Sequence, residues 1–141
     1  MPNAWDITDH CLTTHLQVLR ANYFNDPDLQ VRLFKNDFTP IPGMIQSDLV
    51  EADFVGYNYG LLDATGWGSI TVTDHIAQTI NATITPFTAA PEMVGSQTIY
   101  GYYVLTGTEV LEYAERFEDP RVMSADESLR LRAIFRYKTS T

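Results

Sequence analysis

The sequence has few basic residues, a single cysteine and no long apolar run, and each shortage excludes a class of protein. Nine lysines and arginines stand against 18 acidic residues, giving a net charge of −9, which disfavours binding to the phosphates of nucleic acid. The lone Cys11 excludes an intrachain disulfide and a zinc site built mainly from cysteines. No apolar run approaches the roughly 20 residues of a transmembrane helix, and the first ten residues lack the features of a secretory signal. We therefore expect no nucleic-acid partner and no membrane partner.

The length and apolar content fit one folded domain. A chain of 141 residues has the usual size of a single domain. The hydrophobic fraction of 45%, with two Trp, eight Tyr and seven Phe, argues against intrinsic disorder. We find no internal repeat, no low-complexity tract and no linker, so we expect a single domain over residues 1–141.

The spacing of apolar residues predicts one helix near the start of the chain. Residues three or four positions apart form an apolar stripe between residues 6 and 24: Ile7, Cys11, Leu12, Leu16, Leu19 and Tyr23. Pro27 disfavours helix in the residue before it, so the helix is expected over 6–24.

From residue 29 onward the apolar period is two, which predicts strands. The clearest runs are residues 29–33, 76–84, 99–105 and 129–137. Residues 110–117 fit either a helix or a strand, and the short turn containing Gly107 favours a hairpin. We expect Asp119-Pro120 to end that strand. The whole pattern predicts a mainly β fold, an antiparallel β-sandwich or jelly roll over residues 29–137 with one N-terminal α-helix.

Two groups of chemically active side chains have simple structural interpretations. His10, Cys11 and His15 do not converge on one helix face, and a transition-metal site needs three or four converging ligands. Glu51 and Asp53 would lie on one strand face about 7 Å apart, as any alternate exposed pair does, although a glycosidase also uses two carboxylates. Other catalytic motifs are absent. We therefore predict no catalytic residue, no metal site and no cofactor.

Two further groups suggest surfaces. Tyrosines gather at Tyr100, Tyr102, Tyr103 and Tyr113. They could bind a ligand or a partner. Aromatic pairs also stabilise β-sheets, and we favour this structural interpretation. A basic row alternates with apolar residues near the end of the chain: Arg130, Arg132, Arg136 and Lys138. Such a row protects an edge strand from unwanted pairing, or forms salt bridges to an acidic partner.

Several short motifs carry a resemblance to a known family. They are LFKNDFTP at 33–40, LVEADFVGY at 49–57, IYGYYV at 99–104, LEYAERF at 111–117 and DESLRL at 126–131. Together they resemble a group of small structural proteins of tailed bacteriophages and prophages, in order over residues 6–137. Asp126-Glu127 stands where that family has Gly-Asp, and this pair disfavours the left-handed backbone that glycine adopts in turns.

The resemblance implies a virion component with a β-sandwich or jelly-roll body. Small acidic proteins of this build fit capsid decoration (cement) proteins, which sit as trimers on the outer shell. We therefore expect a non-enzymatic virion structural protein, made in the host cytoplasm, that forms a homotrimer and binds the major capsid protein or another virion protein. The alternative is a tail-associated or receptor-binding module that binds glycans through exposed Tyr57, Tyr59 and Trp67.

Three elements form the predicted partner interface. The first is the N-terminal helix with the tryptophan beside it, and the second is a proline-stiffened loop that loses little entropy on binding. The third is the final strand with its basic row. The candidate residues are Trp5, Phe38, Pro40, Pro42, Met44, Arg130, Arg132, Arg136 and Lys138.

Overall fold

The protein is mainly β, with antiparallel sheets and a short N-terminal helix, as the sequence predicts. The computed structural model describes residues 11, 13–17, 28–63 and 65–137. Residues 11 and 13–17 are helical and lie within the helix predicted over 6–24. The rest of that helix prediction lies outside the described residues. No helix in the described part of the chain is long and apolar enough to cross a membrane.

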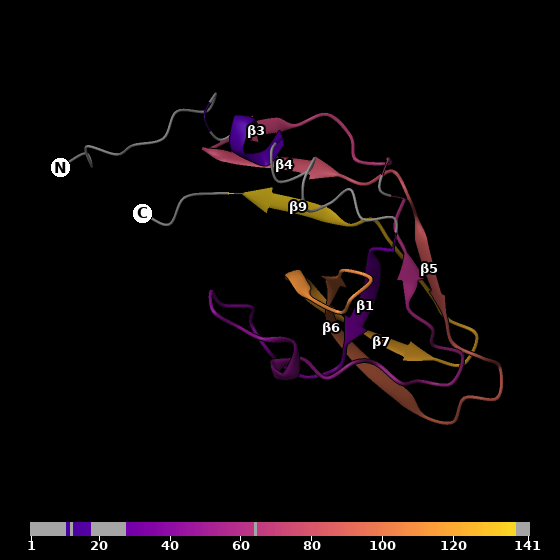
Figure 1. Ribbon diagram of the computed structural model, residues 1–141. Helices are drawn as coiled ribbons and strands as arrows, with labels where there is room; N and C mark the ends of the chain where they lie inside the picture. Colours follow the sequence, from indigo (N-terminus) through magenta and orange to yellow (C-terminus); the bar gives the residue numbers. More distant parts are fainter. Residues whose placement is uncertain (1–10, 12, 18–27, 64, 138–141) are drawn as a thin grey trace.

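The described residues form three antiparallel sheets (Figure 1). The four-stranded sheet has the order β2-β1-β6-β7, the three-stranded sheet the order β3-β4-β9, and β5 pairs with β8. The bounds are β1 Gln30–Phe34, β2 Gly60–Leu61, β3 Thr71–Thr73, β4 Ile76–Ile80, β5 Thr85–Thr88, β6 Ser96–Leu105, β7 Leu111–Ser124, β8 Ser128–Leu131 and β9 Ile134–Tyr137, with a 3-10 turn, η1, at Gln46–Asp48.

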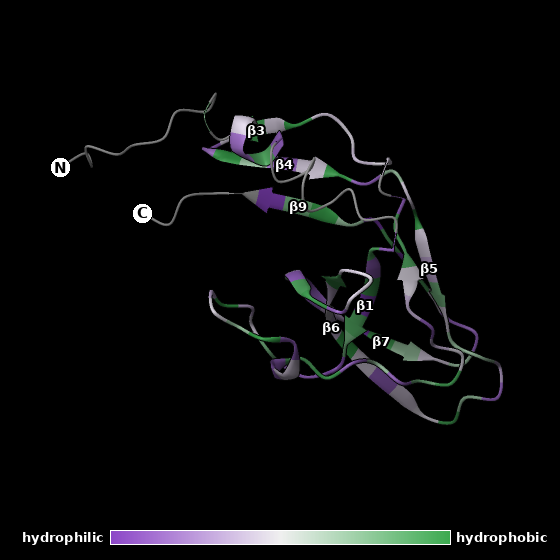
Figure 2. Ribbon diagram, viewed as in Figure 1, coloured by the Kyte–Doolittle hydropathy of each residue, from purple (hydrophilic) through white to green (hydrophobic). Residues whose placement is uncertain are grey.

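Strand β1 separates two apolar clusters because its side chains alternate between the two faces of the sheet. Val31 and Leu33 lie in the main core, whereas Phe34 lies in a second cluster on the other face. The main core joins the four-stranded sheet to the β5-β8 pair through the buried side chains of Phe87 and Leu129. This gives a sandwich-like arrangement, and Figure 2 shows hydrophobic and hydrophilic residues alternating along the strands.

The second cluster is covered by the segment between β1 and β2. Its buried members are Phe34, Leu49, Tyr103 and Leu105, and Phe38 and Met44 pack against it from that segment. The proline-stiffened loop predicted from the sequence is confirmed, because residues 36–43 around Pro40 and Pro42 contain no strand or helix. Residues 36–50 therefore form a layer on the face of the sheet opposite to the main core, and we call this segment the outer loop.

The predicted hairpin is confirmed, but its second strand is longer than predicted. β6 pairs antiparallel with β7, and β7 continues through Pro120 to Ser124. The prediction that Asp119-Pro120 ends the strand is therefore wrong. Ile99 pairs with Arg121 and Gly101 pairs with Arg116, so residues 117–120 bulge out of the ladder. A proline has no N–H to donate, and a bulge is one place where a strand accepts it.

The run predicted at 76–84 ends at Ile80, because Asn81 makes a turn. The buried Asn81 side chain donates a hydrogen bond to the Asp63 carbonyl and accepts one from the Thr83 N–H, both at 2.9 Å. Such side-chain bonds compete with a strand ladder. The buried face of β4 carries Ala77 and Thr79, so small residues pack inward there.

The run predicted at 129–137 is divided into β8 and β9, which belong to different sheets. β8 pairs with β5, and β9 pairs with β4. The alternation is confirmed up to the break, since Leu129, Leu131 and Ala133 are buried. The turn before β8 adopts a left-handed backbone at Asp126, with φ of +66°, a conformation that residues other than glycine disfavour.

Candidate functional site

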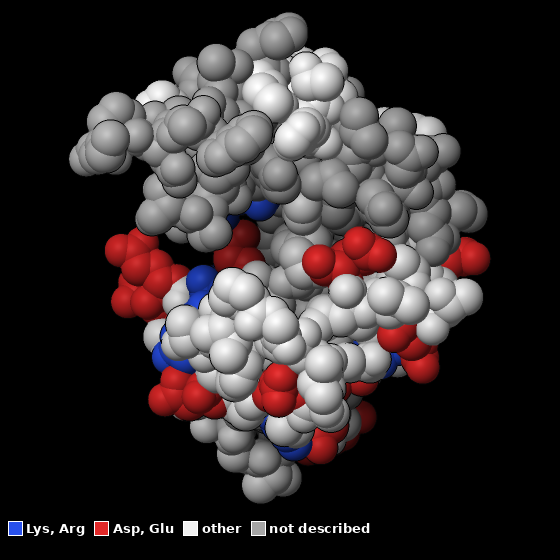
Figure 3. Space-filling view, turned by 60° about the vertical axis from the view of Figure 1, so that its left-hand side comes forward, with Lys and Arg blue, Asp and Glu red and all other residues white. Residues whose placement is uncertain are grey.

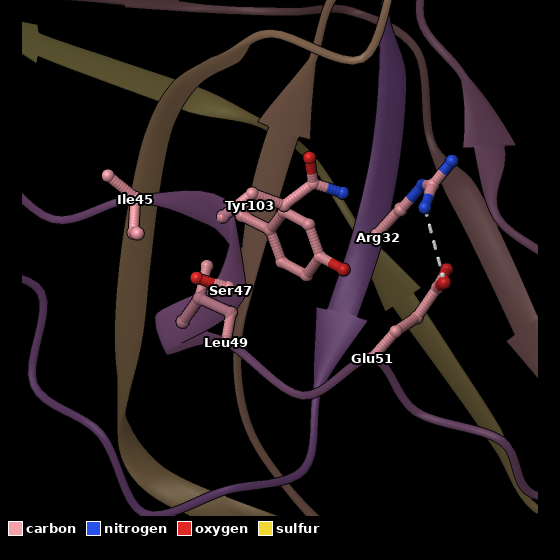
Figure 4. Close-up of a pocket in the computed structure, with 7 residues that line it drawn as sticks. Arg32, Ile45, Ser47, Leu49, Glu51 and Tyr103 are labelled. Atoms are coloured by element: carbon pink, nitrogen blue, oxygen red, sulfur yellow. Dashed lines mark hydrogen bonds and ion pairs between the residues drawn. The ribbon is translucent and has the colours of Figure 1, made fainter.

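A hollow lies on the outer face of the four-stranded sheet, beside the outer loop. It has a volume of about 520 Å³. The residues lining it come from β1, β6 and the outer loop with the residue that follows it: Arg32, Ile45, Gln46, Ser47, Leu49, Glu51 and Tyr103. Figure 4 shows Arg32 and Glu51 pointing toward each other, with Ile45, Ser47 and Leu49 on the other side of the Tyr103 ring. We call this hollow the outer depression.

Arg32 is the central charged group of the outer depression. Its Nη1 lies 3.3 Å from Glu51 Oε1, and its Nη2 lies 3.0 Å from Glu109 Oε1. Gln30 Oε1 accepts a further bond from Nη2 at 2.7 Å. Burial lowers the pKa of Arg32, but the two carboxylates outweigh burial and raise it. The guanidinium is thus a fixed cation, held between two anions.

Two tyrosine hydroxyls complete this network as neutral groups. Tyr57 donates a hydrogen bond to Glu51 Oε2 at 2.9 Å and accepts one from the Leu33 N–H at 3.1 Å. Burial, more than any neighbouring group, raises the pKa of Tyr57. Burial and then the Glu51 carboxylate raise the pKa of Tyr103 to about 12. Both hydroxyls therefore keep their protons at neutral pH and act as hydrogen-bonding groups.

The carboxylate pair considered for hydrolysis belongs to two separate networks. Asp53 Oδ1 lies 2.8 Å from Lys35 Nζ and accepts a bond from Gln97 Nε2 at 2.7 Å. The hydrogen bond from Lys35 lowers the pKa of Asp53 more than any other group. Glu51 instead binds Arg32 and Tyr57. Each carboxylate thus has its own cation in a separate ion pair, whereas the two carboxyl groups of a glycosidase flank one bond and act on it together.

The outer loop contains the central group of predicted interface residues. Phe38 and Met44 are half-buried on the second cluster, Pro40 is also half-buried, and Pro42 is exposed. Three aliphatic side chains in the same loop were not among the predicted residues. Ile41, Ile45 and Val50 are 58%, 60% and 47% exposed. The loop therefore presents apolar side chains to solvent between its buried anchors.

Polar bonds brace the outer loop at its two ends. Asn36 Nδ2 donates to the Asp48 carbonyl, and Asn36 Oδ1 accepts from the Val50 N–H, both at 2.9 Å. Arg116 of β7 pairs with Asp37 and donates to the Phe38 carbonyl at 3.2 Å. The loop is thus held to β7 and to itself, and its exposed aliphatic residues sit on a fixed support.

The other predicted interface residues lie in different settings. Arg130 and Arg132 are exposed, on β8 and just after it, and no ion pair joins either of them to another described residue. Arg136, on β9, pairs with Glu115 of β7 within the chain. Trp5 and Lys138 lie outside the described residues. The three described arginines of the predicted row therefore do not lie along one continuous strand.

The residues predicted as a glycan platform and those considered as metal ligands have the following contacts in the structure. Trp67 is 9% exposed and Tyr57 stacks on Phe87 at 5.9 Å. Tyr59 is 47% exposed, but the Arg32 guanidinium lies over its ring, 5.0 Å from the centroid. The described residues contain no group of three metal-binding side chains. Cys11 Sγ and His15 Nε2 lie 3.8 Å apart, and His10 lies outside the described residues.

The tyrosine cluster is part of the packing of the sheets, the role that we favoured. Tyr102 and Tyr103 are 3% and 2% exposed. Tyr113 of β7 packs edge-on against Phe135 of β9, with ring centroids 5.0 Å apart. These aromatic rings therefore stabilise the fold from inside.

A signal for the outer depression is present in the sequence, because Arg32 is the only charged residue in the strand QVRLF. A charged side chain in the middle of an otherwise uncharged strand needs partners, and the structure supplies Glu51 and Glu109.

A comparison with models of protein families finds no match, and neither does a comparison with curated proteins.

Proposed function

We propose that this chain is a non-enzymatic structural protein of a tailed-phage particle, and that it decorates the capsid as a homotrimer bound to the major capsid protein. The phage assignment rests on the resemblance carried by the motifs between residues 33 and 131. The observation that carries the structural role is the braced outer loop, which presents apolar side chains on a fixed support. A surface that is already ordered loses little entropy when it binds a partner.

The exposed aliphatic side chains of the outer loop suit a contact between proteins. Ile41, Ile45 and Val50 lie within ten residues of one another and all are about half exposed or more. Contiguous apolar side chains on a surface are typical of interaction sites, and we propose that these three side chains form one contact surface. The loop also contains the predicted interface residues Phe38 and Met44, and these half-buried side chains anchor it.

The charge distribution is consistent with a protein that faces away from DNA. In Figure 3 acidic side chains lie on several parts of the visible face, and the visible lysines and arginines lie close to some of them. A net charge of −9 repels packaged DNA and keeps a protein soluble at high local concentration. The carboxylates of Glu51 and Asp53 serve ion pairs, which supports a role without catalysis.

The oligomeric state tests the interface. We expect light scattering after size exclusion to give about 48 kDa, three times the 15.9 kDa of one chain. Replacing Ile41 and Ile45 together by Asp places two charges in the apolar contact, and we expect the mass of one chain. The matched control is Val94→Asp, at a side chain that is 94% exposed in a different loop. A wild-type chain with the mass of a monomer, or a double variant that keeps the trimer mass, contradicts this interface.

A tail-associated or receptor-binding module is the second proposal. One observation favours it, namely a mixed polar and apolar hollow of about 520 Å³ beside an exposed loop. The two proposals differ in particle location, so immunogold labelling of intact particles separates them. Label on the head supports decoration, and label confined to the tail supports the second proposal.

A further inference from the structure

We propose that the outer depression is a binding site for a neutral saccharide of one or two rings. Its lining residues do not include the three aromatic residues predicted for glycan binding. Two of those residues nevertheless adjoin the site, because Tyr57 bonds to Glu51 and the ring of Tyr59 lies against Arg32, 5.0 Å from its guanidinium. Ile45 lines this site and also belongs to the aliphatic surface proposed for the trimer, so sugar binding and the trimer contact compete for that side chain. The site adds a recognition function to a protein whose proposed role is structural.

The charges of the depression select against charged ligands of either sign. An anion would be repelled by the carboxylate of Glu51, whose side chain is one-third exposed, and by Glu109, the second carboxylate paired with Arg32. A cation would meet Arg32, which is held in place by those same two carboxylates. Because like charges in a partly desolvated site repel strongly, a neutral polar ligand meets the least opposition.

The polar groups of the depression match the hydroxyls of a sugar. Glu51 accepts one bond at each oxygen, from Arg32 and Tyr57, and each carboxylate oxygen has a second lone pair for a ligand hydroxyl. Gln46 and Ser47 offer both donors and acceptors from η1 on the opposite wall. A sugar hydroxyl both donates and accepts, so it can bond to each of these side chains.

The apolar groups and the size of the depression fit the same ligand. Ile45 and Leu49 line the hollow with aliphatic carbon, which can contact the C–H groups of a sugar ring. The volume of about 520 Å³ falls within the range of small-molecule sites, roughly 300–1,000 Å³. Bonds from Asn36 and from Asp48, whose carboxylate accepts from the Ile45 N–H at 2.9 Å, hold this wall in place.

The presence of the ion network around Arg32 is weak evidence that it stabilises the sheet. Arg32 is 12% exposed at its side chain, and replacing a buried ion pair by packed apolar side chains is often neutral or stabilising. Perturbed titratable groups gathered in a hollow are typical of functional sites. The network is therefore better explained as the polar part of a binding site than as a support for the fold.

Titration of the labelled protein with sugars tests the site. We would record two-dimensional amide NMR spectra of the isotope-labelled wild-type chain while adding lactose, maltose, cellobiose and the N-acetylglucosamine dimer. We expect millimolar binding of at least one sugar, with shifts at residues 45–49, 32, 51 and 103. Ser47→Trp fills the hollow and should weaken binding at least about tenfold. Ser69→Trp, at another exposed serine, should leave binding unchanged.

The charged relatives of these sugars distinguish the ligand class. Glucuronate and glucosamine should bind more weakly than glucose-based neutral sugars at the same concentration. Retained dispersion of the amide spectrum shows that each variant is folded, so a loss of binding reports on the site. The proposal is overturned if no neutral sugar shifts these residues, if Ser47→Trp binds as the wild type does, or if a charged sugar binds best.

Discussion

Gly101→Ala is expected to be one of the most destabilising single substitutions in the sheet. A Cβ at this position would lie 2.2 Å from the Glu115 carbonyl oxygen and 2.6 Å from two ring carbons of Phe34. The first neighbour is backbone of the paired strand β7, and the second is a fully buried ring. Neither can move without opening the β6-β7 ladder or the second cluster. We expect the free energy of unfolding to fall by about 3 kcal/mol or more.

Gly95→Ala is the matched control for this prediction. A Cβ at Gly95 meets no atom within 4 Å, but the residue has φ of +76°. The control should therefore cost only the backbone strain, about 1 kcal/mol. Urea denaturation of both variants and the wild type measures the difference. A Gly101→Ala variant that is no less stable than the Gly95→Ala variant would contradict the close contact of Glu115 and Phe34 with Gly101.

Tyr102→Phe is the second substitution with a large expected effect, because this hydroxyl joins two sheets. It accepts a bond from the Ile134 N–H at 2.9 Å, and it lies 3.1 Å from the Ile134 carbonyl and from Glu115 Oε2. Removing the hydroxyl leaves these groups to find other partners in a buried site. We expect a loss of about 2 kcal/mol, with faster amide exchange at Ile134 of β9.

Tyr59→Phe is the control for the hydroxyl. Tyr59 is 47% exposed, and replacing it by Phe keeps the ring that lies against Arg32, so we expect a change within about 0.5 kcal/mol. Thermal unfolding of the two variants gives the comparison. If Tyr102→Phe were as stable as Tyr59→Phe, the hydroxyl would not hold β9 against the four-stranded sheet.

The strands and the hairpin could be predicted because their signals are local. The alternation at Leu29, Val31 and Leu33 is buried on one face as expected, and the turn after Leu105 joins β6 to β7. The errors arose where a side chain or a bulge overrides the pattern. Asn81 ends β4 through its own hydrogen bonds, and the bulge at residues 117–120 accepts a proline inside β7.

The sequence marks Arg32 as a charge that needs partners, but the outer depression itself could not be predicted because it depends on contacts between distant residues. Arg32 meets Glu109, which is 77 positions away along the chain, and Glu51, which is 19 positions away. The sequence singled out Glu51 for its spacing from Asp53, but the structure joins it to Arg32 and Tyr57. Only the pairing of β1 with β6 and the course of the outer loop bring these groups together.

The composition of purified phage particles tests the proposed function most directly. Quantitative mass spectrometry of particles from a strain that encodes this chain, after removal of soluble protein, measures its abundance against the major capsid protein. We predict that the chain is present in a fixed ratio to the capsid protein and stays bound through purification. Absence of the chain from intact particles, with the protein found only in the infected-cell lysate, would contradict the proposed function.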